Sequence, residues 1–443
     1  MVTIDQATAG AAAAKAMLSM PRTVKDAALR RMAERLREGA DAVFQANEAD
    51  LAAARAAGLP APMLSRLGYG QKKLEESIAM IGALAAMPDP AARELEARRL
   101  DAGLVLRRIS CPIGLIALIF ESRPDALVQM AALAVKSGNA IIVKGGSEAE
   151  RTNHALAALV ASAGVEAGLP AGWLGQIETR AEVAELLELD RLVDLVIPRG
   201  SNEFVQRIMA TSTVPVLGHA DGVCHVYVHG DADLAMAVRV AVDSKAQYPA
   251  ACNAAEVLLV DAAIAQRAMP VLVAALESAG VALELCPRSA ALVGTSPTRT
   301  VKDDGEWSVE YLDLRMAVRV VDSLDEAIAH INRYGSGHTD AIVCTSPEAG
   351  RRFMTEVDSA SVFRNASTRF ADGYRYGLGA EVGISTGKLH ARGPMGMDGL
   401  LTYKWKLEGE GHVVADYASG KKAFAHVDLP VAGGRAPGAS DEA

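Results

Sequence analysis

Residues 114–146, GLIALIFESRPDALVQMAALAVKSGNAIIVKGG, decide the fold class. The stretch opens with a continuous apolar run, Gly114–Phe120, continues with a helical pattern from Pro124 to Val135, and closes with a second apolar run, Ala140–Val143. Short apolar runs on either side of a helix are typical of buried parallel strands that are joined by a crossover helix. The stretch therefore predicts a parallel βαβ unit.

The same alternation continues toward the C-terminus. A strand at 194–197 is followed by the turn 198–200 and a helix from Ser201. Further elements of both kinds are expected up to about Val362: helices at 232–245, 262–279, 324–333 and 348–357, and strands at 256–260, 317–321, 341–344 and 361–363. The sequence therefore predicts an α/β protein with two tandem domains, each with a mainly parallel sheet covered on both faces.

The N-terminal part predicts a helical layer without obvious catalytic groups. Helical spacing covers 22–57 and 71–87. After the turn signal Asp101–Gly103, alternation in Leu104–Arg108 predicts a β-hairpin with an exposed face. The tail from about Val431 is rich in Gly, Pro, Ser and acidic residues, so we expect disorder there.

Composition excludes several classes of protein. The net charge is -9 and no Lys/Arg run is present, so we expect no nucleic-acid partner. No uncharged apolar run is long enough for a membrane span, and the Ala-rich N-terminus is a poor signal peptide. The five cysteines form no CxxC pair, which argues against a disulfide framework or a zinc ribbon. We expect a cytoplasmic protein, without a membrane partner.

Two turns after predicted strands have the composition of an anion site. Lys144–Ser147 and Arg199–Asn202 combine glycines, which allow close backbone approach, with a cation at the start of a helix. The usual GxGxxG fingerprint follows none of the predicted strands. Ordinary loop glycines and solvated cations explain the two turns about as well.

Cys252 lies in a predicted loop between a helix and a strand. A thiolate is a natural nucleophile toward an activated acyl group and forms a thioester. The competing interpretation is a small buried hydrophobic residue, and it fits the other four cysteines better: Cys111, Cys224, Cys286 and Cys344. The loose group of His219, His225 and His229 has no further ligand at a metal-site spacing, so we expect no metal.

Two loops are dense in polar and cationic groups. They are Asn365–Arg369 and Lys388–Pro394, and glycines punctuate the interval between them. Such loops often line functional sites, but a solvent-facing connection has the same composition.

Nine segments in order over about residues 105–405 resemble the gamma-glutamyl phosphate reductases, a branch of the aldehyde-dehydrogenase superfamily. The segments are Phe120–Pro124, Lys136–Asn139, Val143–Gly146, Val196–Ser201, Pro215–Gly222, Cys252–Asn253, Asn365–Phe370, Gly377–Glu381 and Lys388–Gly396.

The resemblance implies an aldehyde-dehydrogenase-like fold with a β-flap for oligomerisation. The expected NADP-binding domain comprises 1–96 and 111–240, and the catalytic domain 241–397. The flap and C-terminal segment are assigned to 97–110 and 398–430, with a strand near His412–Tyr417, and 431–443 is the tail. A homo-oligomer is expected, with dimer and tetramer both open.

The implied reaction, in L-proline biosynthesis, is NADPH-dependent reduction of L-glutamate 5-phosphate to L-glutamate 5-semialdehyde, with release of phosphate. Cys252 matches the family nucleophile and would carry the thioester. The oxyanion donors would be the Cys252 N–H and a group from the turn 121–123. A separate glutamate 5-kinase would supply the substrate.

Two alternatives remain. Hydrolytic aldehyde dehydrogenases carry a glutamate that activates water, but the corresponding stretch 217–222 has none, and only His219 or Asp221 could replace it. A non-enzymatic subunit that has kept the fold is the second alternative, and the presence of Cys252 argues against it.

The resemblance also assigns binding residues. Cofactor contacts would come from Lys144, Gly200, Ser201 and Glu310. Substrate contacts would come from Arg123, Asn365, Ser367, Thr368, Arg369 and His390.

Overall fold

The computed structural model describes residues 2–121, 123–218, 221–302, 306–378 and 383–431, and these form two compact units. The first unit comprises Met1–Gly200, Arg207–Val216 and Gly396–Ala443, and the second comprises Ser201–Gln206 and Leu217–Met395. Each is described by itself. The predicted tail, 431–443, lies outside the described residues except for Val431.

The first unit contains the predicted βαβ unit. Its parallel sheet has the order β5-β4-β3-β6, with β3 at Leu115–Phe120, β4 at Ala140–Lys144, β5 at Leu174–Gln176 and β6 at Leu195–Arg199. The crossover helix α6 spans Pro124–Ser137. It begins with a proline, whose missing N–H costs nothing in the first turn, and ends at Gly138, where φ is 84°. The parallel arrangement that the sequence predicts is confirmed here.

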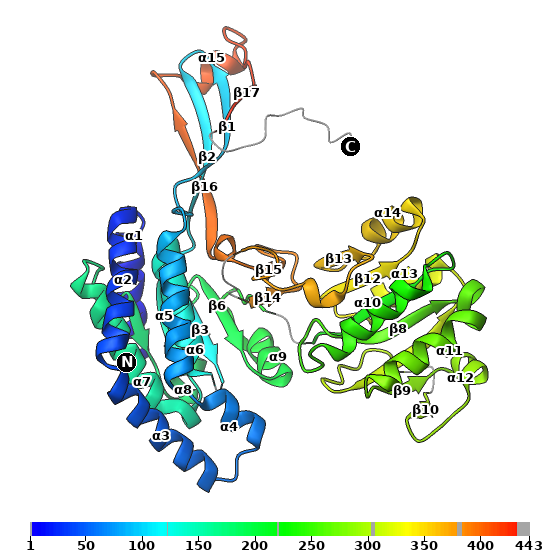
Figure 1. Ribbon diagram of the computed structural model, residues 1–443. Helices are drawn as coiled ribbons and strands as arrows, with labels where there is room; N and C mark the ends of the chain where they lie inside the picture. The colour runs from blue at the N-terminus through cyan, green and yellow to red at the C-terminus, as the bar shows by residue number, and fades with distance from the viewer. Residues whose placement is uncertain (1, 122, 219–220, 303–305, 379–382, 432–443) are drawn as a thin grey trace. The chain divides into compact units, whose positions relative to one another are not determined.

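Further helices of the first unit are α1 (Val2–Met17), α2 (Arg22–Glu38), α3 (Ala40–Ala56), α4 (Ala61–Leu67), α5 (Gln71–Ala86), α7 (Glu150–Glu166) and α8 (Arg180–Leu186) (Figure 1). The single helical run expected at 22–57 is divided at Gly39, which ends α2 and precedes α3. At this break a Cβ on Gly39 would lie 2.5 Å from a terminal methyl group of Leu159 on α7, so the glycine allows the two helices to pack closely.

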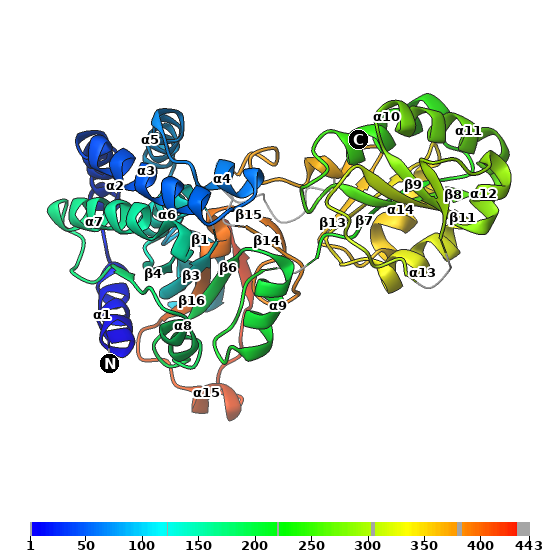
Figure 2. The ribbon, with the colours of Figure 1, turned by 90° about the horizontal axis from the view of Figure 1, so that it is seen from below.

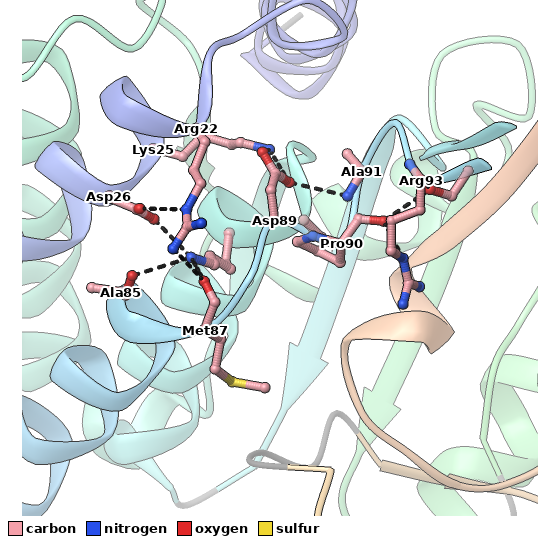
Figure 3. Close-up of polar contacts among 12 residues, drawn as sticks. Arg22, Lys25, Asp26, Ala85, Met87, Asp89, Pro90, Ala91 and Arg93 are labelled. Atoms are coloured by element: carbon pink, nitrogen blue, oxygen red, sulfur yellow. Dashed lines mark hydrogen bonds and ion pairs between the residues drawn. The ribbon is translucent and has the colours of Figure 1, made fainter. Parts of the chain in front are cut away.

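A buried polar cluster joins three helices of the first unit (Figure 3). The ammonium group of Lys136, on α6, is fully buried. It donates hydrogen bonds to Asp26 of α2 at 2.7 Å and to the carbonyl of Met87, just after α5, at 2.6 Å. A buried ammonium group requires such compensation. The cluster therefore connects α2, α5 and α6 through one cation.

An antiparallel sheet of the first unit corresponds to the predicted flap. Its order is β16-β2-β1-β17, with β1 at Glu94–Asp101, β2 at Leu104–Pro112, β16 at Leu401–Glu408 and β17 at Val427–Leu429 (Figure 1). The predicted hairpin is present as β1 and β2.

The prediction of a strand near His412–Tyr417 is wrong, because Val414–Ala418 form the short helix α15. The family plan implied that strand, but a residue's preference for a strand depends on packing against a neighbouring strand, and Val414 is 79% exposed. The ring of Tyr417 instead stacks on Phe424, and its hydroxyl donates to Asp101.

The second unit contains a seven-stranded sheet whose neighbouring strands are all parallel. Its order is β10-β9-β11-β8-β7-β12-β13. The strands are β7 (Cys224–Val228), β8 (Ala255–Asp261), β9 (Ala282–Leu285), β10 (Arg299–Val301), β11 (Arg315–Val321), β12 (Thr339–Val343) and β13 (Ser361–Arg364). The second parallel sheet predicted by the sequence is therefore confirmed.

Helices cover both faces of this sheet (Figure 2). One face packs on α10 (Leu234–Ala246) and α11 (Ala262–Ser278), and the other on α13 (Leu324–Tyr334) and α14 (Pro347–Glu356). The short helix α12 spans Pro287–Val293. Because β7 pairs with β8 and β12, the expected domain boundary after residue 240 differs from the observed division, which assigns β7 to the second unit.

The remaining elements are α9 (Asn202–Thr211) and the antiparallel pair β14 (Gly383–Ser385) and β15 (Gly393–Met395). Within the described parts of the chain, no helix has both the length and the apolarity that a membrane crossing requires.

Candidate active site

Cys252 lies in the loop between α10 and β8 and is partly exposed. The thiol of Cys224, the first residue of β7, donates a hydrogen bond to the Cys252 carbonyl oxygen at 3.3 Å. A Cβ atom on Gly222 would lie 2.0 Å from the same oxygen. The backbone of the predicted nucleophile is therefore packed against the chain that enters β7.

Burial favours the neutral thiol in three of the other cysteines. Burial raises the pKa of Cys224 well above its ordinary value, and it also raises the pKa values of Cys111 and Cys344. Cys286 is buried and accepts a hydrogen bond from the N–H of Ser289 at the start of α12. Since a thiolate is the reactive form, Cys252 is the cysteine whose position best suits nucleophilic chemistry.

The residue after Cys252 anchors the loop from the other side. Asn253 is buried, and its side-chain amide donates to the carbonyl of Ala371 at 2.8 Å. This bond joins the Cys252 loop to the chain that follows the predicted substrate residues. The two segments, which are far apart in the sequence, are neighbours in the second unit.

Ser367, Thr368 and Arg369 are buried and form a compact turn. The Ser367 hydroxyl accepts a hydrogen bond from the Arg369 N–H at 3.2 Å. Ser244 of α10 donates to the Ser367 hydroxyl and accepts from the Thr368 N–H, both at 3.2 Å. Three of the predicted substrate residues are thus tied to the helix that leads into the Cys252 loop.

Arg369 is a cation close to the nucleophile. Its Nε donates to the side-chain oxygen of Gln247 at 2.9 Å, and its guanidinium carbon lies 5.8 Å from the centre of the Tyr248 ring. Burial lowers the pKa of Arg369, Arg375 lowers it further, and the negative charge of the Cys252 thiolate acts in the opposite direction. A guanidinium in this position is able to stabilise a thiolate or to bind an anionic substrate group.

The structure places the other predicted substrate residues differently. The Asn365 amide exchanges two hydrogen bonds with the backbone of Cys344, at 2.9 and 3.0 Å, and holds a positive φ of 57°. His390 is exposed, with φ 68°. Arg123 belongs to the first unit, where it precedes α6 and lies 3.6 Å from Asp125. Their roles toward substrate stay predictions.

Lys144 is the last residue of β4 and is half-buried at the carboxyl edge of the first unit's sheet. Burial lowers its pKa, while Glu148 and Glu121 raise it and Arg180 lowers it. A Cβ on Gly145 would lie 2.0 Å from the Asn153 amide nitrogen, and one on Gly146 would lie 2.2 Å from the Glu148 carboxylate. The two glycines therefore allow the side chains of Asn153 and Glu148 to pack closely against the turn after β4.

Gly200 and Ser201 follow β6 at the same edge, and both are exposed. Ligands of open parallel sheets bind at the carboxyl ends of the strands. The ends of β4 and β6 are thus suitable places for a nucleotide.

Glu310 belongs to a small network in the second unit. Its carboxylate accepts hydrogen bonds from the Asn202 amide, at the start of α9, and from the Gly222 N–H. The Asn202 amide also donates to Asp221 at 2.8 Å. Burial raises the pKa of Glu310, and these hydrogen bonds oppose the effect.

Of the two alternative bases for a hydrolytic reaction, Asp221 lies within the described residues. Asp221 accepts hydrogen bonds from Asn202 and Gln206, so its carboxylate is engaged by side chains of α9. His219 lies outside the described residues, as does Glu381 of the matched segment 377–381.

Several residues of this site were not predicted. Asn202 belongs to the predicted turn Arg199–Asn202, but its contact with Glu310 was not predicted. Gln247, which contacts Arg369, has no distinguishing signal in the sequence. Its role depends on the fold bringing α10 beside the turn 367–369.

Comparisons with known proteins show the family to which the chain belongs. The sequence profile of the aldehyde dehydrogenase family matches residues 2–290. A gamma-glutamyl phosphate reductase from Pelotomaculum thermopropionicum is 52% identical over 403 residues, which cover 91% of this chain and 92% of that protein. The chain belongs to the gamma-glutamyl phosphate reductases of the aldehyde dehydrogenase family.

Other gamma-glutamyl phosphate reductases support the assignment. The protein from Acetivibrio thermocellus is 50% identical, covering 91% of this chain and 93% of its own. The crystal structure of the Thermotoga maritima protein superposes with a TM-score of 0.91 at 37% identity, covering 93% of this chain and 100% of that one. The predicted fold and family are confirmed, and the chain is an oxidoreductase of amino-acid biosynthesis that uses a nicotinamide cofactor.

Proposed function

We propose that the protein reduces L-glutamate 5-phosphate to L-glutamate 5-semialdehyde with NADPH, through a thioester on Cys252, in L-proline biosynthesis. The observation that carries the proposal is the placement of a partly exposed Cys252 beside the buried cation of Arg369 and the turn Ser367–Arg369. The names of the relatives at about half identity supply the substrate class.

The chemistry follows from the groups around Cys252. Its thiolate attacks the acyl carbon of the substrate, a C–S bond forms, and the C–O bond to phosphate breaks. Arg369 and the hydroxyl groups of Ser367 and Thr368 supply charge and hydrogen-bond donors for the anionic substrate. When the aldehyde forms, the C–S bond breaks and the thiolate is regenerated. Acyl phosphate and thioester are both activated, so the first transfer needs no external acid.

The residues present fit a nicotinamide dinucleotide phosphate. The cofactor supplies the hydride that reaches the thioester carbon. Lys144, a half-buried cation beside the glycines of the β4 turn, would contact the 2′-phosphate. Gly200 and Ser201 would hold the pyrophosphate, and the Glu310 carboxylate would accept hydrogen bonds from the nicotinamide ribose. The Asn202 amide fixes the orientation of that carboxylate.

An assay in the reverse direction tests the reaction. With pyrroline-5-carboxylate, which equilibrates with the open semialdehyde, we expect NADP⁺ reduction that depends on added phosphate in the wild type and is abolished in Cys252→Ser. Equal rates with and without phosphate, with a free acid as product, would show a hydrolytic aldehyde dehydrogenase instead. No turnover in either condition would support a non-enzymatic subunit.

We propose further that the enzyme is a homo-oligomer that associates through the β16 edge. Tyr403, Trp405 and Leu407 of β16 are each about half exposed, and β16 is the terminal strand of its sheet. These apolar residues alternate along β16 with Lys404, Lys406 and Glu408, and an exposed edge strand with one apolar face is able to pair with another chain. Light scattering of wild type and Trp405→Glu tests this: an unchanged mass would count against the edge as the interface.

The cellular setting is also proposed. All five cysteines are free thiols, which suits the reducing cytoplasm. A separate glutamate 5-kinase would supply the labile acyl phosphate, with direct transfer between the two enzymes. Isotope dilution tests the transfer, since loss of label to added unlabelled acyl phosphate would show release into solution.

A further inference from the structure

A fully buried ion pair stands at the base of the Cys252 loop. The ammonium group of Lys245 lies 2.5 Å from the Glu256 carboxylate, and both side chains are 0% exposed. Lys245 is the penultimate residue of α10, and Glu256 is the second residue of β8. The pair therefore closes the loop in which Cys252 lies, seven residues after Lys245 and four before Glu256.

The same pair reaches the segment that carries Glu310. The second carboxylate oxygen of Glu256 accepts a hydrogen bond from the Leu312 N–H at 3.4 Å. Leu312 has a positive φ of 53°, a conformation that side-chain-bearing residues rarely adopt and that the surrounding structure must hold in place. Glu256 thus joins the nucleophile loop to the chain two residues beyond Glu310.

Net stabilisation is a poor explanation for this pair. Burial raises the pKa of Glu256 and lowers that of Lys245, as expected for two charges removed from water. The desolvation of a buried pair commonly offsets its attraction, and apolar replacements of similar size are often as stable. This pair lies on either side of Cys252 in the sequence, so it is better explained by the conformation that it gives to the Cys252 loop than by its contribution to folding.

We propose that Lys245 and Glu256 are positioning residues that hold Cys252 and the Glu310 segment in one geometry. The inference rests on the proposed function, in which the acyl group on Cys252 and the nicotinamide must meet. Neither residue touches substrate in this account. Both act through the loop and through the Leu312 N–H.

The test replaces both charges at once, in Lys245→Met/Glu256→Met. This variant leaves no unpaired buried charge, so we expect a melting temperature close to that of the wild type. We expect kcat to fall about a hundredfold while the KM for NADPH changes little, because a displacement of about 1 Å has an effect of that size. Alkylation of Cys252 by iodoacetamide at neutral pH should slow by about tenfold as the thiol moves relative to Arg369.

The matched control removes another buried lysine pair, in Asp26→Leu/Lys136→Met, in which the Lys136 side chain is 0% and the Asp26 side chain 11% exposed. That pair lies in the first unit (Figure 3), where Lys136 also donates to the carbonyls of Ala85 and Met87. The replacement removes these hydrogen bonds as well, so it should lower the melting temperature without changing kcat or the alkylation rate. A folded Lys245→Met/Glu256→Met enzyme with wild-type kcat and wild-type alkylation would overturn the proposal.

Two further measurements keep the result decisive. If the double variant does not fold, Lys245→Met/Glu256→Gln takes its place, because it also removes both charges but keeps a side-chain acceptor for the Leu312 N–H. An unchanged kcat and alkylation rate in this variant would also overturn the proposal, and a fall in both supports it. If the wild type lacks reductase activity, the proposed function fails by itself, and the alkylation rate still decides whether the pair positions Cys252.

Discussion

Gly222 lies so close to Cys252 that a Cβ atom on it would be 2.0 Å from the Cys252 carbonyl oxygen. The neighbouring atoms are backbone, so they cannot rotate away as the end of a side chain could. The position of the nucleophile therefore depends on the absence of a side chain at residue 222.

Gly222→Ala should displace the Cys252 backbone. We expect kcat to fall about a hundredfold and the free energy of unfolding to fall by about 1–3 kcal/mol, the usual cost of overpacking. Steady-state kinetics and urea unfolding measure the two effects. Gly82→Ala is the control, because Gly82 lies in α5 and no atom lies within 4 Å of its Cβ position. This variant should retain full activity, and its free energy of unfolding should rise by about 1 kcal/mol. Wild-type turnover in Gly222→Ala would show that the close approach does not matter.

Lys144→Ala should discriminate between the two nicotinamide cofactors. Loss of the cation at the end of β4 removes a charged contact to the 2′-phosphate, which is worth about 1.5–3 kcal/mol. We therefore expect the KM for NADPH to rise by about ten- to a hundredfold while the KM for NADH stays the same. Lys144→Arg keeps the charge, so its KM for NADPH should rise much less. An equal effect on both cofactors would remove Lys144 from the 2′-phosphate site.

Arg369→Ala should weaken the use of substrate more than the binding of cofactor. The buried guanidinium near Cys252 is held by Gln247 and Tyr248, so its loss removes a fixed positive charge. We expect kcat/KM for the acyl phosphate to fall by at least about tenfold, with little change in the KM for NADPH. Arg352→Ala on α14, where the side chain pairs with Glu356, is the surface control. An unchanged rate with the acyl phosphate would contradict the assignment.

Asp231 should contribute to stability near neutral pH and lose that contribution in acid. Burial raises its pKa, but hydrogen bonds from His229, Thr345 and Ser346 outweigh burial and lower the pKa to about 2 from 3.8. Since folding favours the ionised form, this contribution is present above about pH 4 and is lost as the pH falls toward 2. Thermal unfolding of wild type and Asp231→Asn at pH 5 and pH 3 tests the sign. The difference in melting temperature between wild type and Asp231→Asn should be smaller at pH 3 than at pH 5. A larger difference at pH 3 would contradict this prediction.

The parallel sheets could be predicted because their signal is local. The apolar runs Gly114–Phe120 and Ala140–Val143 are too short for helices and flank a clear helical pattern, so periodicity alone defines β3 and β4. The sheet to which a strand belongs is not local information. Strand β7 has the same apolar composition in either sheet, and only its pairing with β8 and β12 assigns it to the second unit.

In the candidate site too, the sequence does not show which distant residues meet. Cys252, Lys144 and Arg369 stand in motifs that match the family, so the resemblance was enough to propose them as site residues. Lys245 and Glu256 are 11 residues apart in no periodic pattern, and they meet only because the loop between them returns on itself. The strand that the resemblance implied near His412–Tyr417 is replaced by the helix α15, because β-branched residues such as Val413 and Val414 favour a strand only where a partner strand is available.

The thioester on Cys252 is the central claim, and trapping it is the most direct test. Wild-type enzyme mixed with pyrroline-5-carboxylate and NADP⁺ without phosphate should form about one NADPH per subunit in a burst, and then stop. Mass spectrometry of the quenched protein should find the glutamyl adduct on the peptide that contains Cys252, and added phosphate should release it. Absence of an adduct from that peptide, together with wild-type turnover in Cys252→Ser, would contradict the account.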